Sequence, residues 1–296
     1  MNRLFLKVKA KYYKMMSQLQ GQVVYRDKYG LKYFLWNDTR LESTILQGSR
    51  TDDEGVILWI NRLLDQYRSR QENPYDKPIV AIDVGAFIGI ISLAMAKKLW
   101  PQDRVYAFEP SDRNFQRLCQ NIQLNNKQHI IQPIHSGVLH QKKEKAYLKL
   151  MDRPGENHIV EDIGKNSDGQ YNVFSAIALD DFCREKEIER IHILKIDTEG
   201  SDAKVLEGAW SLLQQGRIDF IFAECEEPDT DNFKVMKKIL LDQHYQIYYI
   251  VRHHEKLVRT LKESSRFNKK PPMNMLAVSP KTPFDLPELE AISAAH

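Results

Sequence analysis

The chain has 296 residues, of which 42% are hydrophobic and 28% are charged, so it is long enough to bury one large α/β core with room for an N-terminal extension. Its net charge of +3 is too small to indicate a nucleic-acid-binding protein. The three cysteines are widely separated and lack metal-ligand spacing, which suits a reducing compartment. Because no apolar run is long enough to cross a bilayer and the start lacks an apolar leader, we expect a cytoplasmic protein.

The N-terminal part of the sequence predicts a small cap with helices and a hairpin. Residues 1–19 combine basic side chains with apolar ones at helical spacing, as in an amphipathic helix that rests on an anionic membrane surface or, more commonly, packs on its own domain or a partner. Residues 22–36 alternate apolar and polar around Lys28-Tyr29-Gly30, the pattern of a β-hairpin. A helix is expected from Glu54 to Tyr67. We interpret residues 1–76 as an α+β cap on the following sheet.

From residue 77 the sequence alternates apolar runs with helical segments, which predicts a parallel sheet with helices on both faces. Five runs indicate parallel strands, beginning near residues 80, 105, 130, 191 and 218. Two further runs, 245–251 and 275–278, are expected to form an antiparallel pair. The long polar stretch between the third and fourth strands, with one strand-like piece at Tyr147 to Leu150, is expected to be functional or mobile. We assign residues 77–282 to one α/β domain and 283–296 to a tail.

Two glycines follow the first strand of this domain, in the run Asp83-Val84-Gly85-Ala86-Phe87-Ile88-Gly89. They are expected in a strand-to-helix turn, where a missing Cβ lets a ligand approach the backbone. A dinucleotide site would need Gly-x-Gly-x-x-Gly, whereas Asp83 would repel a diphosphate and favour a cation. S-adenosylmethionine fits, since it carries a sulfonium and no phosphate, and an NAD-dependent oxidoreductase is the less favoured alternative.

The remaining cofactor contacts are expected after the second and third strands. Glu109 ends the second strand and is placed to accept hydrogen bonds from both ribose hydroxyls. We also assign Ala86, Pro110 and Ser136 to the cofactor site. The alternative is that Asp83 and Glu109 only cap helices.

These motifs together carry a family resemblance. The glycine turn, Ala107-Phe108-Glu109-Pro110, Leu179-Asp180-Asp181-Phe182 and Lys195-Ile196-Asp197-Thr198-Glu199-Gly200, in this order, resemble the FkbM family of S-adenosylmethionine-dependent methyltransferases. The resemblance implies a class I methyltransferase fold, which is a Rossmann-like, doubly wound, seven-stranded sheet. It also implies O-methylation of a hydroxyl on a saccharide or secondary metabolite. Phe87 stands where the family usually has asparagine, and Asp202 where it usually has glutamate.

Acidic residues after the fourth and fifth strands are the candidate catalytic groups. A hydroxyl acceptor must lose its proton, so a carboxylate near the methyl group is expected as a general base. Asp197 with Glu199 is the first choice, and Glu224 faces them from the fifth strand, although all three could instead belong to helix caps or an acidic loop. Two facing carboxylates could hold a divalent metal, but we do not expect one.

The expected partner is a small-molecule or glycan hydroxyl acceptor. Nucleic acid is not expected, because Lys270-Pro271-Pro272-Met273 lacks the polar lead and the aromatic ring of an amino-methylating DNA enzyme. Besides the oxidoreductase, a non-catalytic binding protein that keeps the methyltransferase fold stays open as an alternative.

Overall fold

The computed structural model describes residues 11–13, 15–16, 19, 21–36, 40–46, 53–70, 77–150, 158–160, 170–225, 230–251, 257–258, 274–282 and 284. The basic helix predicted for residues 1–19 lies mostly outside the described residues, although those described between 11 and 19 are helical. In the part of the chain that the structure describes, none of the helices is both long and apolar enough to span a bilayer.

The main sheet has eight strands in the order β13-β12-β14-β11-β10-β3-β4-β5. The strands are β3 (Val80–Val84), β4 (Arg104–Phe108), β5 (Ile131–Ile134), β10 (Ile191–Ile196), β11 (Ile218–Glu224), β12 (Gln246–Ile250), β13 (Leu257–Val258) and β14 (Asn274–Val278). Strands β5, β4, β3, β10 and β11 are parallel, and β14 pairs antiparallel with both β11 and β12. The seven predicted strands are confirmed, and the two-residue β13 extends the sheet at the β12 edge.

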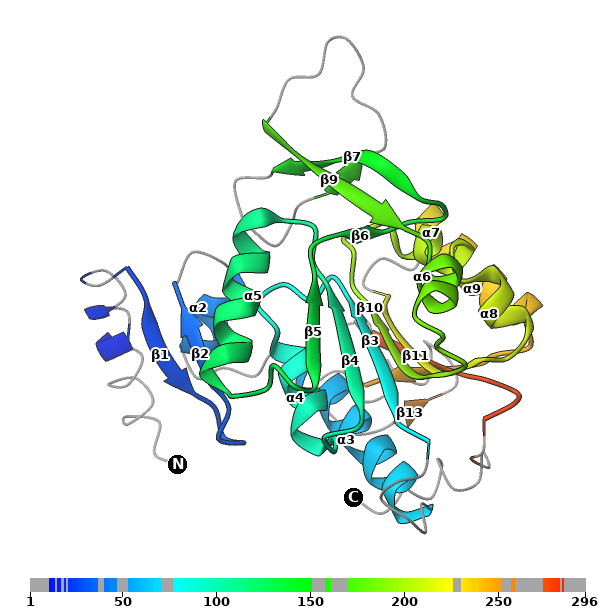
Figure 1. The fold of residues 1–296 in the computed structure, drawn as a ribbon, viewed down its shortest axis with the longest axis horizontal. Coiled ribbons are helices and arrows are strands. Elements are labelled where there is room, and N and C mark those ends of the chain that lie inside the picture. The colour runs from blue at the N-terminus through cyan, green and yellow to red at the C-terminus, as the bar shows by residue number, and fades with distance from the viewer. Residues whose placement is uncertain are drawn as a thin grey trace.

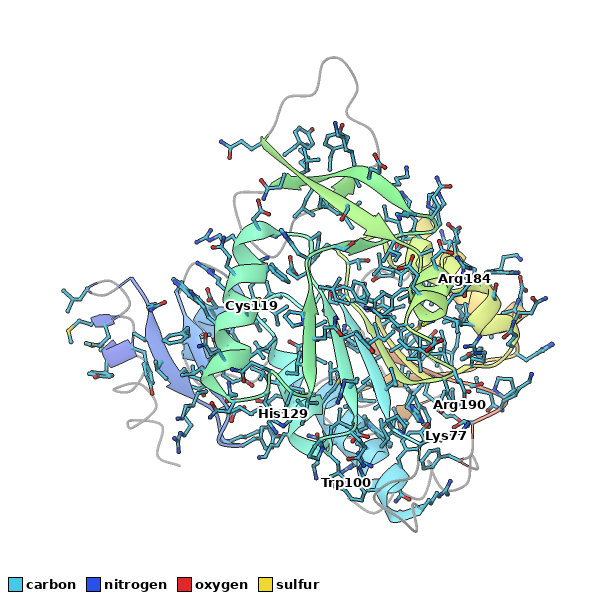
Figure 2. All side chains as sticks on the ribbon, in the orientation of Figure 1. Lys77, Trp100, Cys119, His129, Arg184 and Arg190 are labelled. Carbon is cyan, nitrogen blue, oxygen red and sulfur yellow. The ribbon has the colours of Figure 1, made fainter. Side chains whose placement is uncertain are left out.

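Helices cover both faces of the sheet, as Figure 1 shows. One apolar layer joins the sheet to α3 (Asp53–Arg70), α4 (Ile90–Lys98) and α5 (Asp112–Leu124). The other joins it to α6 (Leu179–Glu185), α7 (Asp202–Glu207), α8 (Trp210–Gln214) and α9 (Asp231–Asp242). In Figure 2, Lys77, Trp100 and Arg190, which precede β3, β4 and β10, lie towards the bottom, where the amino ends of the parallel strands gather. The sheet is doubly wound, as predicted.

A second sheet lies beyond the carboxyl ends of the parallel strands (Figure 1). Its order is β6-β9-β7-β8, formed by β6 (Gly137–Val138), β7 (Lys143–Leu150), β8 (His158–Val160) and β9 (Gln170–Ile177). Ala146 and Leu148 of β7 pack with Phe174 and Ala176 of β9 in a small apolar cluster. The described residues of the stretch predicted to be a polar insertion with one strand therefore form a four-stranded sheet beyond the carboxyl ends of the parallel strands.

The N-terminal cap contains the hairpin β1 (Val23–Arg26) and β2 (Lys32–Leu35), which is confirmed, and then α2 (Arg40–Leu46) and α3. The hairpin lies beside α5 (Figure 1). Phe284, which was assigned to the C-terminal tail, is buried with its ring centroid 4.7 Å from that of Tyr67 in α3. The proposed divisions at residues 76 and 282 stay predictions.

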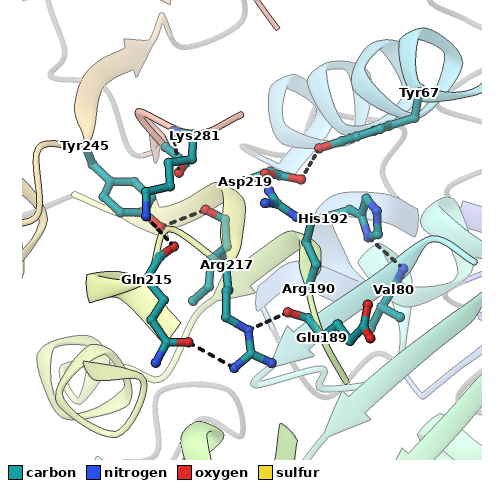
Figure 3. A network of polar contacts seen from close by, with 12 residues as sticks. Tyr67, Val80, Glu189, Arg190, His192, Gln215, Arg217, Asp219, Tyr245 and Lys281 are labelled. Carbon is teal, nitrogen blue, oxygen red and sulfur yellow. Dashed lines mark hydrogen bonds and ion pairs between the residues drawn. The ribbon is translucent and has the colours of Figure 1, made fainter. Parts of the chain in front are cut away.

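A polar network lies at the amino ends of the parallel strands (Figure 3). The Tyr67 hydroxyl donates to Asp219 Oδ2 at 2.6 Å, and Arg190 forms an ion pair with the other oxygen of Asp219. The Val80 N–H donates to His192 Nδ1 at 3.1 Å, and burial, together with the Arg190 charge, lowers the pKa of His192 to about 4. This network fastens α3 to the sheet at the edge opposite the candidate site.

Candidate cofactor and acceptor site

The turn after β3 is built from left-handed backbone. Gly85, Phe87 and Gly89 have φ of 81°, 51° and 91°. A Cβ on Gly85 would lie 1.8 Å from the carbonyl oxygen of Asp197, so no side chain fits there. We expected this glycine to admit a ligand, but the structure gives a different reason, which is the close approach of the chain leaving β10.

Neighbouring elements hold this turn in place. The N–H groups of Gly85 and Ala86 donate to the Phe108 carbonyl at 3.0 and 2.9 Å, which ties the turn to the end of β4. A Cβ on Gly89 would meet Leu118 Cδ1 of α5 at 2.7 Å, so this glycine lets α4 and α5 pack closely. The direct cofactor contacts assigned to Gly85, Ala86 and Gly89 stay predictions.

Glu109 follows β4 and reaches across to the same turn. Its Oε2 accepts from the Phe87 N–H at 2.8 Å, and its Oε1 accepts from the Ser111 N–H at 2.9 Å. Glu109 is only 5% exposed, and burial raises its pKa to about 7, against the opposing effect of these two N–H groups and a hydrogen bond from the Asn114 side chain. The carboxylate thus lies at the meeting point of the turn, β4 and the start of α5.

The groups around Glu109 fit the ribose of an adenosine cofactor. A carboxylate has about four lone-pair sites, so its two backbone bonds and the Asn114 bond leave room for one hydroxyl donor. Asn114 is 5% exposed, and its Oδ1 is buried without a hydrogen-bond partner among the described residues. Buried polar atoms are normally paired, so an unpaired oxygen beside Glu109 is consistent with a ligand donor there.

Asp83 lies beneath the turn and does not face solvent, since it is 1% exposed. Ser92 of α4 donates to its Oδ2 at 2.5 Å. Burial raises the pKa of Asp83 to about 6, although the Ser92 bond and the Lys195 charge lower it. From this buried position, the ionised carboxylate would attract a cationic ligand electrostatically. Direct contact between Asp83 and the cofactor stays a prediction.

The ends of β10 and β11 bring together the acidic residues predicted for the acceptor side. Lys195 is 1% exposed, and its Nζ lies 3.1 Å from Asp197 Oδ2, while the Asp197 side chain is 35% exposed. Burial opposes the charge on Lys195, but Asp197, Asp53 and Glu224 outweigh it and raise its pKa. Burial, with the charge of Asp197, raises the pKa of Glu224 to about 9, against the opposing charge of Lys195.

The loop between β10 and α7 holds the third predicted acceptor residue. Glu199 and Gly200 adopt φ of 50° and 96°, so the chain turns sharply just after Asp197. Asp202 fixes this loop, because its Oδ1 accepts from the Thr198 hydroxyl at 3.0 Å and its Oδ2 accepts from Asn232 at 3.1 Å. Asp202, which stands where the family usually has glutamate, therefore links α7 to α9.

Pro110 and Ser136 lie at the loops where they were expected. Pro110 is half-buried between Glu109 and Ser111, and the Ser111 hydroxyl caps α5 by accepting from the Asn114 N–H at 3.5 Å. The Ser136 hydroxyl lies 2.8 Å from the Ser175 carbonyl of β9, so it ties the loop after β5 to the second sheet. Its contact with the cofactor stays a prediction.

Sequence reasoning missed two residues next to these groups. Apart from His192 and Lys195, the residues of β10 are all apolar. A lysine in such a strand indicates a buried acidic partner. Asn114 gave no such signal, since an asparagine in the first turn of a helix is common. Within the described ranges, no cluster of three or more His, Cys, Asp or Glu side chains is arranged to hold a metal ion.

Sheet order, the reversed strand β14 between β11 and β12, and an acidic residue facing the turn after β3 define a class I methyltransferase fold. The described fold resembles that of the METTL16 MTase domain, with a TM-score of 0.50, 11% identity, and coverage of 96% of this chain and 93% of that one. The chain belongs to the FkbM methyltransferase family, since residues 83–254 match the methyltransferase FkbM domain.

Two fungal proteins are similar to this chain. Methyltransferase sdnD of Sordaria araneosa is 27% identical over 167 residues, which cover 45% of this chain and 62% of that protein. Methyltransferase 1 of Beauveria bassiana (strain ARSEF 2860) is 26% identical over 160 residues, which cover 47% of this chain and 64% of that protein. The similarity therefore spans less than two thirds of each relative.

Proposed function

We propose that the protein transfers a methyl group from S-adenosylmethionine to a hydroxyl of a saccharide or secondary metabolite. The observation that carries the proposal is the buried Glu109 carboxylate, bonded to the Phe87 N–H of the glycine turn and adjacent to the unpaired Asn114 oxygen. This is the chemistry that a ribose with two hydroxyl donors requires. The FkbM match supports the same cofactor, which supplies an electrophilic methyl group when bound.

Asp197 is our candidate for the base that accepts the proton of the acceptor hydroxyl. It is the more exposed member of the pair with Lys195, so an acceptor has access to it. Because its pKa is raised, Glu224 is a poorer candidate for the base and, in its protonated form, would donate a hydrogen bond. Glu199 would help to orient the acceptor from the loop after β10. A divalent metal stays the alternative to Asp197 as the means of activating the hydroxyl.

We further propose a small-molecule or glycan acceptor rather than nucleic acid, and a cytoplasmic location. A peripheral membrane contact through residues 1–19 stays a prediction, and most of that segment lies outside the described residues.

The test begins with calorimetric titration of S-adenosylhomocysteine, with NAD in a parallel cell. We expect saturable one-to-one binding of S-adenosylhomocysteine and none of NAD. Hydroxylated acceptors are then screened with methyl-labelled S-adenosylmethionine, and Asp197→Asn is expected to keep cofactor affinity while lowering turnover about 10²-fold or more. NAD binding alone would establish the oxidoreductase alternative, and cofactor binding without turnover on any acceptor would favour the non-catalytic one.

A further inference from the structure

Helix α5 carries a stripe of buried polar side chains that runs from the candidate ribose site to the N-terminal hairpin. Asn114, Arg117 and Asn121 are buried and recur every three or four residues on one face of the helix, and the half-buried C-cap Asn125 follows four residues after Asn121. The first of them hydrogen-bonds to Glu109, and the last two contact the hairpin. Buried polar groups need partners, so each contact along this face is specific.

The outer edge of β2 is paired by side chains instead of by a third strand. Alternate N–H groups of a strand point to the same edge, and those of Lys32, Phe34 and Trp36 donate to Asn125, Asn121 and Glu42 at 2.9, 2.7 and 3.0 Å. This pairing fixes the hairpin on α5 at a defined register.

Asn121 also hydrogen-bonds to the glycine turn. Its Oδ1 accepts from the Phe34 N–H, and its Nδ2 donates to the Ile88 carbonyl at 2.9 Å, while the side chain is fully buried. One residue earlier, the Phe87 N–H is bonded to Glu109. The turn is therefore held from two sides, by Glu109 on β4 and by Asn121 on α5.

We propose that Asn121 is a positioning residue through which the N-terminal hairpin fixes the turn for cofactor binding. The hairpin lies outside residues 83–254, the part that matches the family, so the contact adds an element of this chain to the site. The inference rests on the proposed function, since it takes the turn and Glu109 to hold S-adenosylmethionine. Loss of the Ile88 contact frees one side of the turn, and the cofactor must then order it on binding.

Asn125, the half-buried C-cap of α5 four residues after Asn121, provides a control. It holds the same strand, since its Oδ1 accepts from the Lys32 N–H at 2.9 Å and its Nδ2 donates to the Lys32 carbonyl at 2.6 Å. It makes no hydrogen bond to the turn among the described residues. Replacing either asparagine by aspartate keeps the acceptor for the hairpin N–H and removes the amide donor.

The experiment compares binding of S-adenosylhomocysteine to the full-length wild type, Asn121→Asp and Asn125→Asp, by calorimetry. We expect Asn121→Asp to weaken binding about fivefold or more and Asn125→Asp to stay within about twofold of the wild type. Thermal unfolding of the two variants measures how far each substitution destabilises the fold. Equal affinity in all three proteins, or an equal loss in both variants, would overturn the inference.

Hydrogen exchange on the wild type keeps the test independent of how the variants fold. S-adenosylhomocysteine is expected to slow exchange of the Phe34 amide, as well as amides of the turn, because both are joined through Asn121. Slowing restricted to the turn and the start of α5 would contradict the coupling. A wild type that binds no S-adenosylhomocysteine would refute the proposed function itself, whereas binding without the Asn121 effect would refute only this inference.

Discussion

Cofactor affinity should depend on pH through Glu109. Burial raises the pKa of this carboxyl to about 7, so near neutrality it is divided between its protonated and ionised forms. A ribose hydroxyl donates a hydrogen bond to the ionised form, which lowers the pKa of Glu109 in the complex. Binding below pH 7 must then release a proton, and affinity falls as the pH falls.

The size of the effect follows from the shift. If the pKa in the complex is two units or more below that of the free protein, the dissociation constant at pH 6 is about tenfold larger than at pH 8, or about 1.4 kcal/mol weaker. The glutamine of Glu109→Gln cannot ionise. Its NH₂ group would face one of the two backbone N–H groups that donate to the carboxylate, so one of these hydrogen bonds would be lost. It should bind more weakly, by roughly 1.5–3 kcal/mol at pH 8, without this pH dependence.

The assay is calorimetric titration of S-adenosylhomocysteine at pH 6 and pH 8, in two buffers of different ionisation enthalpy. The buffers report the proton released, and the Glu109→Gln variant corrects for titration of the ligand and of other groups. Affinity of the wild type that does not change between these pH values, or the same pH dependence in Glu109→Gln, would refute the assignment of Glu109 to the ribose.

Two further predictions concern the scaffold. Gly85→Ala should destabilise the protein by about 2–5 kcal/mol, through its left-handed φ and the clash with the Asp197 carbonyl, whereas Gly30→Ala, with φ of 86° and open space around it, should lose only about 1–2 kcal/mol. Denaturant unfolding measures both, and equal losses would argue against the clash. His192→Asn should reduce the loss of stability on acidification, because the folded pKa of about 4 lies below that of the unfolded chain, so the wild type loses up to about 3 kcal/mol as the pH falls from 6.5 to 4. Carboxyls with raised pKa make the folded state more stable as the pH falls, and they do so equally in both proteins. The difference between the two curves of unfolding free energy against pH therefore reports His192 alone. Parallel curves would contradict a neutral His192 in the folded protein.

Most of the main sheet could be predicted because its strands are short apolar runs, separated by segments whose apolar residues have helical spacing. The α5 helix illustrates this, since Ser111 marks its start and Leu118 and Ile122 mark its buried face. Of the second sheet, only the strand-like piece Tyr147 to Leu150 was predicted, because β7 begins with Lys143-Glu144-Lys145 and its partner strands β8 and β9 are separated from it along the chain. Pairing of such strands depends on neighbours that the sequence does not bring together.

The candidate site was predicted to the level of strand ends but not of contacts. Glu109 and Asp197 could be located because each ends a recognisable strand. The requirement for a glycine at position 85 could not be predicted, because it depends on the position of the Asp197 carbonyl, more than a hundred residues away in the sequence. Asn121 and Phe34 are 87 residues apart, and only the folded structure reveals that one side chain serves both the hairpin and the glycine turn.

Buried carboxyl groups have different partners at the amino and carboxyl ends of the parallel strands, and this difference bears on function. At the amino ends, both oxygens of Asp219 are paired, by Tyr67 and Arg190, which stabilises the fold. At the carboxyl ends, burial raises the pKa of Asp83, Glu109 and Glu224 to about 6, 7 and 9, with a single buried lysine among them. Clustered carboxyls with raised pKa values disfavour their own ionisation, and a cationic ligand relieves that cost. A sulfonium cofactor should therefore bind more tightly than its neutral thioether analogue and, at equal ligand concentration, stabilise the protein more against unfolding, which thermal unfolding with each ligand would measure.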